Sequence, residues 1–218
     1  ATYRSKVDLN FKGNAALDAK LTAVGDGLAP AGTDMSFLAP GFNAVVTKGR
    51  VTVIAPAVAA LSTAYNWDKF VLELTLDETF WSSYRQLNFN YDQSAPGGGA
   101  LDQYFGPVEK NWKNADAIRL GFEYNVVKPL TLMAGICYEE GGAPDSTLGF
   151  ELPDAGAWVF SVGARYAVTD RLDVGVSALL DVMNSRTVPA TANNTQTIDG
   201  EFSGADALLI TAGIQYRF

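Results

Sequence analysis

Residues 207–218 read Ala207-Leu-Leu-Ile-Thr-Ala-Gly-Ile-Gln-Tyr-Arg-Phe218. From Leu208 onward an apolar side chain occupies every second position, and from residue 211 the alternate positions hold Thr211, Gly213, Gln215 and Arg217. Successive side chains of a β-strand point to opposite faces, so this alternation predicts a strand with one apolar and one polar face.

The same alternation recurs along the chain, giving about eight segments in all. The other segments are 3–11, 50–65, 70–91, 118–124, 130–138, 158–166 and 172–182. Pro56 interrupts the second of them, and it predicts a kink or bulge there because proline has no N–H to donate to a neighbouring strand. Short turns at 66–69, 127–129 and 169–171 alternate with long loops at about 12–48, 92–114, 139–154 and 185–203.

Short turns at one end of the strands and long loops at the other are typical of an outer-membrane β-barrel, whose apolar side chains face lipid and whose polar side chains face the lumen. The last segment resembles the closing strand of such a barrel. Aromatic side chains near the short turns predict a girdle at that end: Tyr65, Trp67, Phe70, Tyr124, Tyr166, Tyr216 and Phe218. We therefore expect an all-β, transmembrane, antiparallel up-and-down β-barrel in the bacterial outer membrane, with residues 1–218 as a single domain.

Composition excludes several other classes of protein. No run approaches 18 apolar residues, so a transmembrane helix is not expected. The chain has one cysteine and no histidine, which excludes an internal disulfide, a Cys/His zinc site and a histidine-based catalytic triad. The net charge of -8 argues against a nucleic-acid partner. We expect no enzyme activity, no cofactor and no metal; the acids Glu139, Glu140 and Asp145 are interpreted as a solvated loop.

Several stretches, in this order and spacing, resemble the FadL-type family of outer-membrane transporters for long-chain fatty acids and other hydrophobic compounds. They are Thr2-Tyr-Arg-Ser-Lys-Val-Asp8, Trp81-Ser-Ser-Tyr84, Asn111-Trp-Lys113, Ile118-Arg-Leu-Gly121, Met133-Ala-Gly-Ile-Cys-Tyr138, Leu152-Pro-Asp154, Ser161-Val-Gly-Ala-Arg-Tyr166 and Gly213-Ile-Gln-Tyr-Arg-Phe218. The resemblance covers nearly the whole chain but only the C-terminal portion of the family's pattern. Where the family usually has an Asp-Arg pair, this chain has Ala155-Gly156-Ala157, which puts a charge pair there in doubt.

The resemblance implies a fourteen-stranded barrel plugged by an N-terminal hatch, of which this chain looks like the last eight strands. The first residues are neither an initiator methionine nor a signal peptide, so we expect a processed or partial chain. An eight-stranded barrel is filled by its own side chains. We therefore expect the hatch and the first six strands to be supplied by the rest of the polypeptide.

Charged side chains fall in the register that faces the lumen. They are Arg4, Lys6, Asp8, Glu73, Asp77, Arg119, Glu123, Glu139, Arg165, Asp173, Asp181 and Arg217. One interpretation is a network of ion pairs that stiffens the wall, since an isolated buried charge is costly. The other is that Lys110, Lys113 or Arg119 holds a ligand carboxylate; the resemblance implies a basic head-group residue near this strand start.

Two apolar sets are further candidates for ligand contact. Met35, Phe37, Leu38 and Phe42 make the loop at 12–48 unusually apolar, and exposed apolar patches often mark interaction sites. In the family, the corresponding loop helps to form a first groove for substrate. Met133, Cys137, Val159 and Leu179 lie in the lumenal register without being polar, so an alkyl chain could lie along them. Both sets are explained equally well by packing.

These observations predict passive, non-enzymatic uptake of a hydrophobic small molecule such as a fatty acid, by a protein surrounded by membrane lipid or, in vitro, detergent. The alternative is a small filled barrel that acts as a membrane anchor or adhesin through its outward loops. A soluble β-sandwich that binds ligands is a third class, but it predicts short loops at both ends.

Overall fold

The computed structural model describes residues 1–17, 45–91, 107–150, 152–195 and 197–218. They are almost entirely β-strands joined by turns and three short 3-10 helices. The chain divides into two compact units. The first comprises Ala1–Lys6, Pro56–Arg85 and Lys110–Phe218, and the second comprises Val7–Ala55 and Gln86–Glu109. Among the described residues, no helix is long and apolar enough to cross a membrane.

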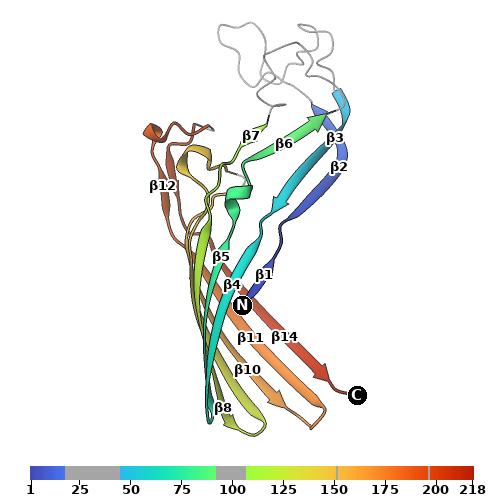
Figure 1. The fold of residues 1–218 in the computed structure, drawn as a ribbon, viewed down its shortest axis with the longest axis vertical. Coiled ribbons are helices and arrows are strands. Elements are labelled where there is room, and N and C mark those ends of the chain that lie inside the picture. Colours follow the sequence, from blue (N-terminus) through green and yellow to red (C-terminus); the bar gives the residue numbers. More distant parts are fainter. Residues whose placement is uncertain (18–44, 92–106, 151, 196) are drawn as a thin grey trace, which may run out of the picture. The chain divides into compact units, whose positions relative to one another are not determined.

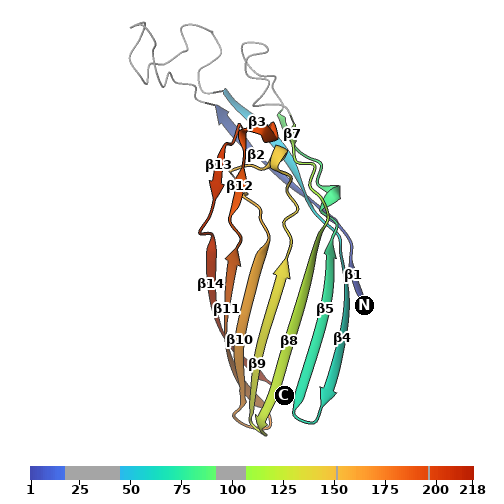
Figure 2. The same ribbon diagram turned by 90° about the vertical axis from the view of Figure 1, so that its left-hand side faces the viewer.

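The first unit is built on one antiparallel sheet of eight strands, called the wall below (Figures 1 and 2). In spatial order the strands are β1 (Thr2–Arg4), β4 (Val58–Trp67), β5 (Phe70–Thr79), β8 (Ala115–Val127), β9 (Leu130–Glu139), β10 (Ala157–Ala167), β11 (Leu172–Met183) and β14 (Asp206–Tyr216). Each strand of the wall lies beside the wall strand that precedes it in the sequence, as in an up-and-down barrel. The missing numbers belong to strands of the other two sheets. Within the described residues the sheet is open, with β1 and β14 at its edges.

Two smaller sheets complete the described chain. The second unit contains β2 (Val7–Leu17), β3 (Val45–Ala55), β6 (Gln86–Tyr91) and β7 (Val108–Glu109), in that spatial order. A hairpin of β12 (Arg186–Val188) and β13 (Gly200–Phe202) lies in the first unit. The 3-10 helices are η2 (Trp81–Ser83), η3 (Asp145–Thr147) and η4 (Ala190–Ala192).

Tight turns set the register of the wall. Trp67 pairs with Phe70 across a two-residue turn in which Asp68 has φ of 46°, a conformation that matches the twist of a hairpin. Val127 pairs with Leu130 in the same way, and Leu172 donates its N–H to the Thr169 carbonyl at 3.3 Å. The expected turns at 66–69, 127–129 and 169–171 are therefore confirmed.

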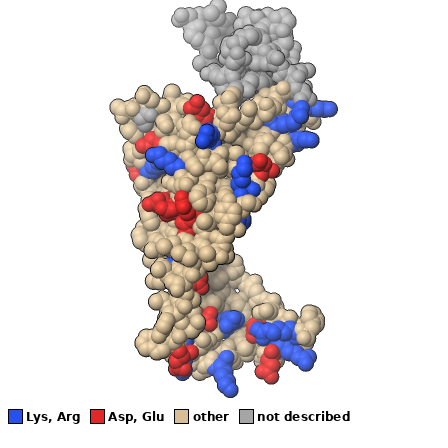
Figure 3. All heavy atoms as spheres, viewed as in Figure 1, with Lys and Arg blue, Asp and Glu red and all other residues tan. Residues whose placement is uncertain are grey.

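Burial alternates along the strands as the sequence predicts. In β9, Leu132 and Ile136 are exposed, whereas Met133 is half-buried and Cys137 is buried. The apolar row thus lies on the outer face and the polar and small row on the sheltered face. Figure 3 shows charged side chains gathered at the turn end of the wall, leaving a less charged band above them. The aromatic side chains expected there include a stacked pair, Phe70 and Tyr124, with ring centroids 4.7 Å apart.

Three of the predicted strands, 3–11, 50–65 and 70–91, are wrong as single strands, because each is divided between the two units. The segment 50–65 is divided at Pro56, where a kink was expected, and 70–91 is divided into β5 and β6 with η2 between them. The segment 3–11 does not form one strand, because β1 ends at Arg4 and β2 begins at Val7. The break lies opposite Pro56: Arg4 pairs with Val58, and Val7 pairs with Ala55. Since Pro56 ends one ladder, the strand facing it is interrupted at the same level. Beyond the break β2 continues to Leu17, into the segment expected to be a loop from residue 12.

The two faces of β5 predict opposite responses to a new charge. We expect Leu74→Lys to lower the free energy of unfolding from a lipid bilayer by about 2–4 kcal/mol, because Leu74 belongs to the outer row. Thr75→Lys, on the sheltered face beside the Glu73 carboxylate, is the matched control and should cost far less. Denaturant titration in bilayers measures both, and equal losses would contradict the assignment of the faces.

Candidate functional site

The sheltered face of the wall carries a row of side chains from neighbouring strands. Cross-strand pairing places Thr75, Arg119, Cys137, Val159 and Asp181 side by side on β5, β8, β9, β10 and β11. Directly paired side chains of a sheet lie about 5 Å apart, so each touches the next. Side chains separated by more than a hundred positions in the sequence are thereby brought into one surface.

An open hollow of about 330 Å³ lies along this row, and we call it the Cys137 hollow. Its lining includes Arg119, Gly121, Cys137, Val159, Ser161 and Leu179. Gly121 creates much of the room, because a Cβ added there would meet only the Glu73 Cβ, at 4.0 Å. The hollow therefore has an apolar floor and a charged margin.

Arg119, a predicted head-group residue, is held by carboxylates at the margin of the hollow. Its Nε donates to the Asp77 Oδ2 at 2.6 Å, and its Nη2 lies 3.6 Å from the Glu139 Oε2. Nearer the turns, Arg217 Nη2 donates to the Asp173 Oδ2 at 2.5 Å. These ion pairs join neighbouring strands of the wall, as in the first interpretation of the lumenal charges.

Met133 lies in a different hollow from Leu179. The Met133 hollow, of about 360 Å³, also has Arg165, Asp173, Ser177 and Thr211 in its lining. The structure therefore brings Leu179 together with Arg119, Cys137 and Val159, and it places Met133 one step further toward the turns.

Lys110 and Lys113 lie where the chain approaches β8, and neither lines the Cys137 hollow. Lys110 is only 4% exposed, and its N–H donates to the Arg85 carbonyl at 2.8 Å. Lys113 is exposed, and its N–H donates to the Gly142 carbonyl at 2.8 Å. A head-group role for these lysines stays a prediction. Met35, Phe37, Leu38 and Phe42 lie outside the described residues.

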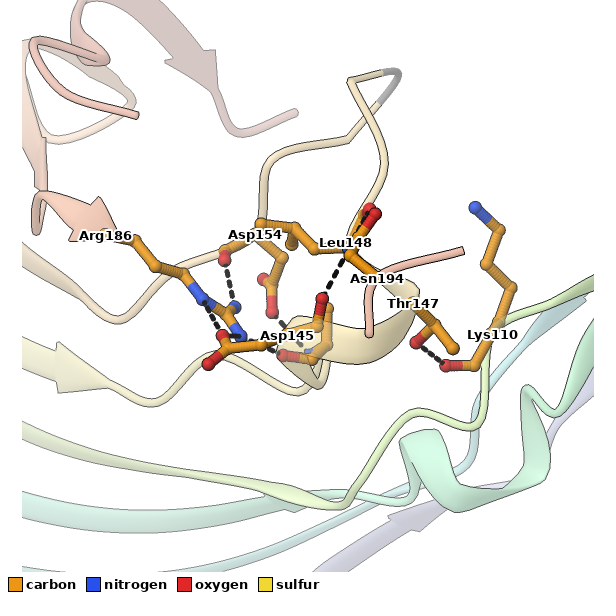
Figure 4. A network of polar contacts seen from close by, with 8 residues as sticks. Lys110, Asp145, Thr147, Leu148, Asp154, Arg186 and Asn194 are labelled. Carbon is orange, nitrogen blue, oxygen red and sulfur yellow. Dashed lines mark hydrogen bonds and ion pairs between the residues drawn. The ribbon is translucent and has the colours of Figure 1, made fainter. Parts of the chain in front are cut away.

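Sequence reasoning did not find the polar network that folds two of the loops (Figure 4). Arg186 donates to the Asp145 Oδ1 at 2.6 Å and to the carbonyls of Ala143 and Asp154 at 2.6 and 2.5 Å. Asn194 donates to the carbonyls of Asp145 and Leu148, and Thr147 donates to that of Lys110. Asp145, interpreted from the sequence as part of a solvated acidic loop, has a side chain that is 46% exposed and is also the ion-pair partner of Arg186.

A second feature that the sequence did not reveal is an aromatic cluster at the loop end of β5 and β8. The Trp112 ring lies 4.8 Å from Trp81 and 5.5 Å from Tyr84, measured between centroids. Asn114 links the same segments, accepting from the Ser82 N–H at 3.1 Å and donating to the Glu78 Oε1 at 2.9 Å. Among the described residues, no group of three or more His, Cys, Asp or Glu side chains is arranged to hold a metal ion.

The whole chain, residues 1–218, matches the family model described as outer membrane protein transport protein (OMPP1/FadL/TodX). The chain belongs to this family. The resemblance seen in the sequence is thus confirmed, and so is the expected location in the bacterial outer membrane.

Relatives and solved structures agree with this membership. The chain is 28% identical over 173 residues to outer membrane protein P1 of Haemophilus influenzae, covering 79% of this chain and 32% of that protein. It is 28% identical over 225 residues to the 47 kDa outer membrane protein of Pasteurella multocida, covering 99% and 46%. It is 27% identical over 180 residues to the long-chain fatty acid transport protein of Escherichia coli, covering 81% and 36%.

The fold matches a Pseudomonas aeruginosa FadL homologue with a TM-score of 0.72 at 17% identity, covering 98% of this chain and 47% of that chain. It also matches the P. putida toluene transporter TodX with a TM-score of 0.55 at 13% identity, covering 99% and 44%. The chain spans less than half the length of these relatives and neighbours. The all-β barrel class predicted from the sequence is confirmed, with this chain forming part of such a barrel.

The network around Arg186 predicts local rather than global loss of structure when it is broken. Replacing Arg186 with Gln removes charge-assisted hydrogen bonds, each of which contributes roughly 1.5–3 kcal/mol. We expect amide hydrogen exchange at Ala143 and Asn194 to become faster by about tenfold or more, with the amides of β10 unchanged. Arg171→Gln, in an exposed turn, is the control. Faster exchange throughout the wall would contradict a local role.

Proposed function

We propose that this chain forms part of the wall of a barrel that takes up hydrophobic small molecules, such as fatty acids, passively across the outer membrane. The observation that carries the proposal is the Cys137 hollow on the sheltered face, whose floor includes Cys137, Val159 and Leu179. Burying an alkyl chain there contributes about 0.8 kcal/mol per methylene group. The exposed apolar row on the outer face suits contact with lipid.

Substrate moves in three stages in this proposal. The apolar residues Met35, Phe37, Leu38 and Phe42 capture it at the outer rim. A basic residue, Lys110 or Lys113, then holds a carboxylate head group near the start of β8. The alkyl chain passes along Met133 and Leu179, and a gate in the hatch, which belongs to the rest of the polypeptide, releases it. No catalytic step is assigned to any residue.

The alternative function, a filled barrel that serves as an anchor or adhesin, requires the sheltered face to be closed by ion pairs. The pairs that the described residues form are Arg119 with Asp77 and Glu139, and Arg217 with Asp173. They lie along the wall and leave the Cys137 and Met133 hollows open. Uptake is therefore the better supported of the two.

Filling the Cys137 hollow tests the proposal. Gly121→Leu places a side chain where nothing lies closer than 4.0 Å to the new Cβ, so the wall should fold normally while the hollow disappears. We expect uptake of a labelled fatty acid or hydrocarbon into proteoliposomes to fall by about tenfold, as expected when roughly 1.4 kcal/mol of binding is lost.

Gly200→Leu is the matched control, because a Cβ there meets nothing within 4 Å and Gly200 lies in the β12–β13 hairpin, outside the hollow. Normal uptake by Gly121→Leu, with folding verified by heat-modifiable gel migration, would rule out passage through the hollow.

The lysines near β8 give a separate test of head-group binding. Replacing Lys110 and Lys113 together with Ala should weaken fatty-acid binding by about tenfold, because a charge-assisted hydrogen bond contributes roughly 1.5–3 kcal/mol. Lys110 is buried, so Lys113→Ala alone provides a variant that leaves the interior intact. Lys128→Ala, in an exposed turn, controls for the change in net charge. Unchanged affinity in the double variant would remove both lysines from the site.

A further inference from the structure

Residues 110–113, called the lysine segment below, are held in place through their backbone. Lys110 and Asn111 donate their N–H groups to the Arg85 carbonyl at 2.8 and 2.9 Å. Asn111 has φ of 46°, a left-handed conformation that bends the chain between the two lysines. The segment lies between β7 and β8 and belongs to neither strand. The positions of Lys110 and Lys113 are therefore set by backbone contacts with neighbouring segments and not by strand pairing.

The loop between β9 and β10, residues 140–156, supplies two of these contacts. The Thr147 hydroxyl donates to the Lys110 carbonyl, and the Gly142 carbonyl accepts from the Lys113 N–H at 2.8 Å. Thr147 is 4% exposed, and a buried hydroxyl without a partner is costly, so this hydrogen bond is not readily exchanged for one to water. Each lysine of the segment is thereby held by one residue of the loop.

Gly142 allows the loop to lie this close to the lysine segment. A Cβ at this position would lie 2.8 Å from the Lys113 carbonyl oxygen and 3.5 Å from the Trp112 ring. The first of these distances is shorter than a real Cβ contact, and its partner is a backbone atom that a rotamer change cannot move aside. Any larger residue at 142 must therefore push the loop and the segment apart.

The loop is itself fixed by the connection between β11 and β14. Arg186 and Asn194 of that connection donate to Asp145 or to carbonyls of the loop, and the Thr195 N–H donates to the Ser146 carbonyl at 2.9 Å. Figure 4 shows Arg186, Asp145, Thr147 and Lys110 as successive members of one series of contacts. The loop thus reaches the lysine segment already in a defined conformation.

We infer that the loop between β9 and β10 sets the affinity for a carboxylate head group, with Thr147 and Gly142 as positioning residues for Lys110 and Lys113. The inference rests on the head-group role proposed for these lysines. Thr147 and Gly142 act through the backbone of the lysine segment and do not touch the ligand. Because a hydrogen bond weakens steeply beyond its normal length, a displacement of roughly 1 Å is sufficient to lower the affinity.

The test compares laurate with dodecanol, which has the same twelve-carbon chain and no carboxylate. Binding to the complete protein in lipid nanodiscs is measured by equilibrium dialysis and corrected with empty nanodiscs. Thr147→Val removes the hydroxyl and keeps the shape of the side chain. We expect the laurate affinity to fall by about fivefold and the dodecanol affinity to stay the same, since only laurate uses the lysines. Thr147→Ser, which keeps the hydroxyl, should restore laurate binding to within about twofold of the original value.

Gly142→Ala is a second variant that acts on the same contact surface without removing a hydrogen-bonding group. It should lower the laurate affinity by about fivefold or more and leave dodecanol unaffected, because the added Cβ displaces the backbone of Lys113. Gly200→Ala is the matched control. A Cβ there meets nothing within 4 Å, and Gly200 lies in the β12–β13 hairpin, so both affinities should be unchanged.

A double-mutant cycle separates positioning from a general loss of structure, with folding verified by heat-modifiable gel migration. In protein that carries Lys110→Ala and Lys113→Ala, adding Thr147→Val should not weaken laurate binding further. A further loss in that background, an unchanged laurate affinity in Thr147→Val or Gly142→Ala, or an equal fall in dodecanol affinity would overturn the inference and leave the head-group role intact. If the double lysine variant alone binds laurate normally, the head-group role fails and the inference fails with it, so the two failures are distinguishable.

Discussion

The register of the wall is the constraint on which the rest of the structure depends. Side chains of a strand alternate between faces, so a slip of one residue would move every apolar side chain of that strand to the sheltered face. Two-residue turns such as the one at Asp68, with its left-handed backbone, leave no freedom for such a slip. In the row from Thr75 to Asp181, tight turns fix the pairing of β8 with β9 and of β10 with β11, whereas long connections join β5 to β8 and β9 to β10.

On the sheltered face, ion pairs join neighbouring strands, and glycines lie between these pairs. Arg119 with Asp77 ties β8 to β5, and Arg217 with Asp173 ties the end of the chain to β11. Between these pairs Gly121 faces Gly135 across β8 and β9; a Cβ at Gly121 would meet only the Glu73 Cβ, at 4.0 Å, whereas the Ser161 hydroxyl lies over Gly135. Charged side chains therefore join neighbouring strands, and Gly121 leaves space beside them on the sheltered face.

Local periodicity was sufficient to predict the five strands from β8 to β14 in the wall, the tight turns and the two faces, because alternation and turn residues are properties of short segments. It was not sufficient for the break between Arg4 and Val7, since its cause, Pro56, lies on the neighbouring strand. The contacts of Arg186 were not predicted, for the same reason. Its partners, Asp145 and two carbonyls, come from a loop more than thirty residues away, and no spacing in the sequence links them. The alternation did predict that Arg119 lies on the lumenal face. Which carboxylates pair with it depends on distances in the folded chain.

Counting charges on a face is therefore more informative than counting cations in a sequence. A basic residue at the expected position, Arg119, suggests an anion site until its neighbours are known. The cross-strand rows then show that carboxylates surround it and that Asp181 has an oxygen without a donor. A cation that is already paired contributes little to binding an anion, because forming the new contact requires breaking the old one. In the described part of the wall, Arg119 therefore joins β8 to the strands that carry its carboxylate partners.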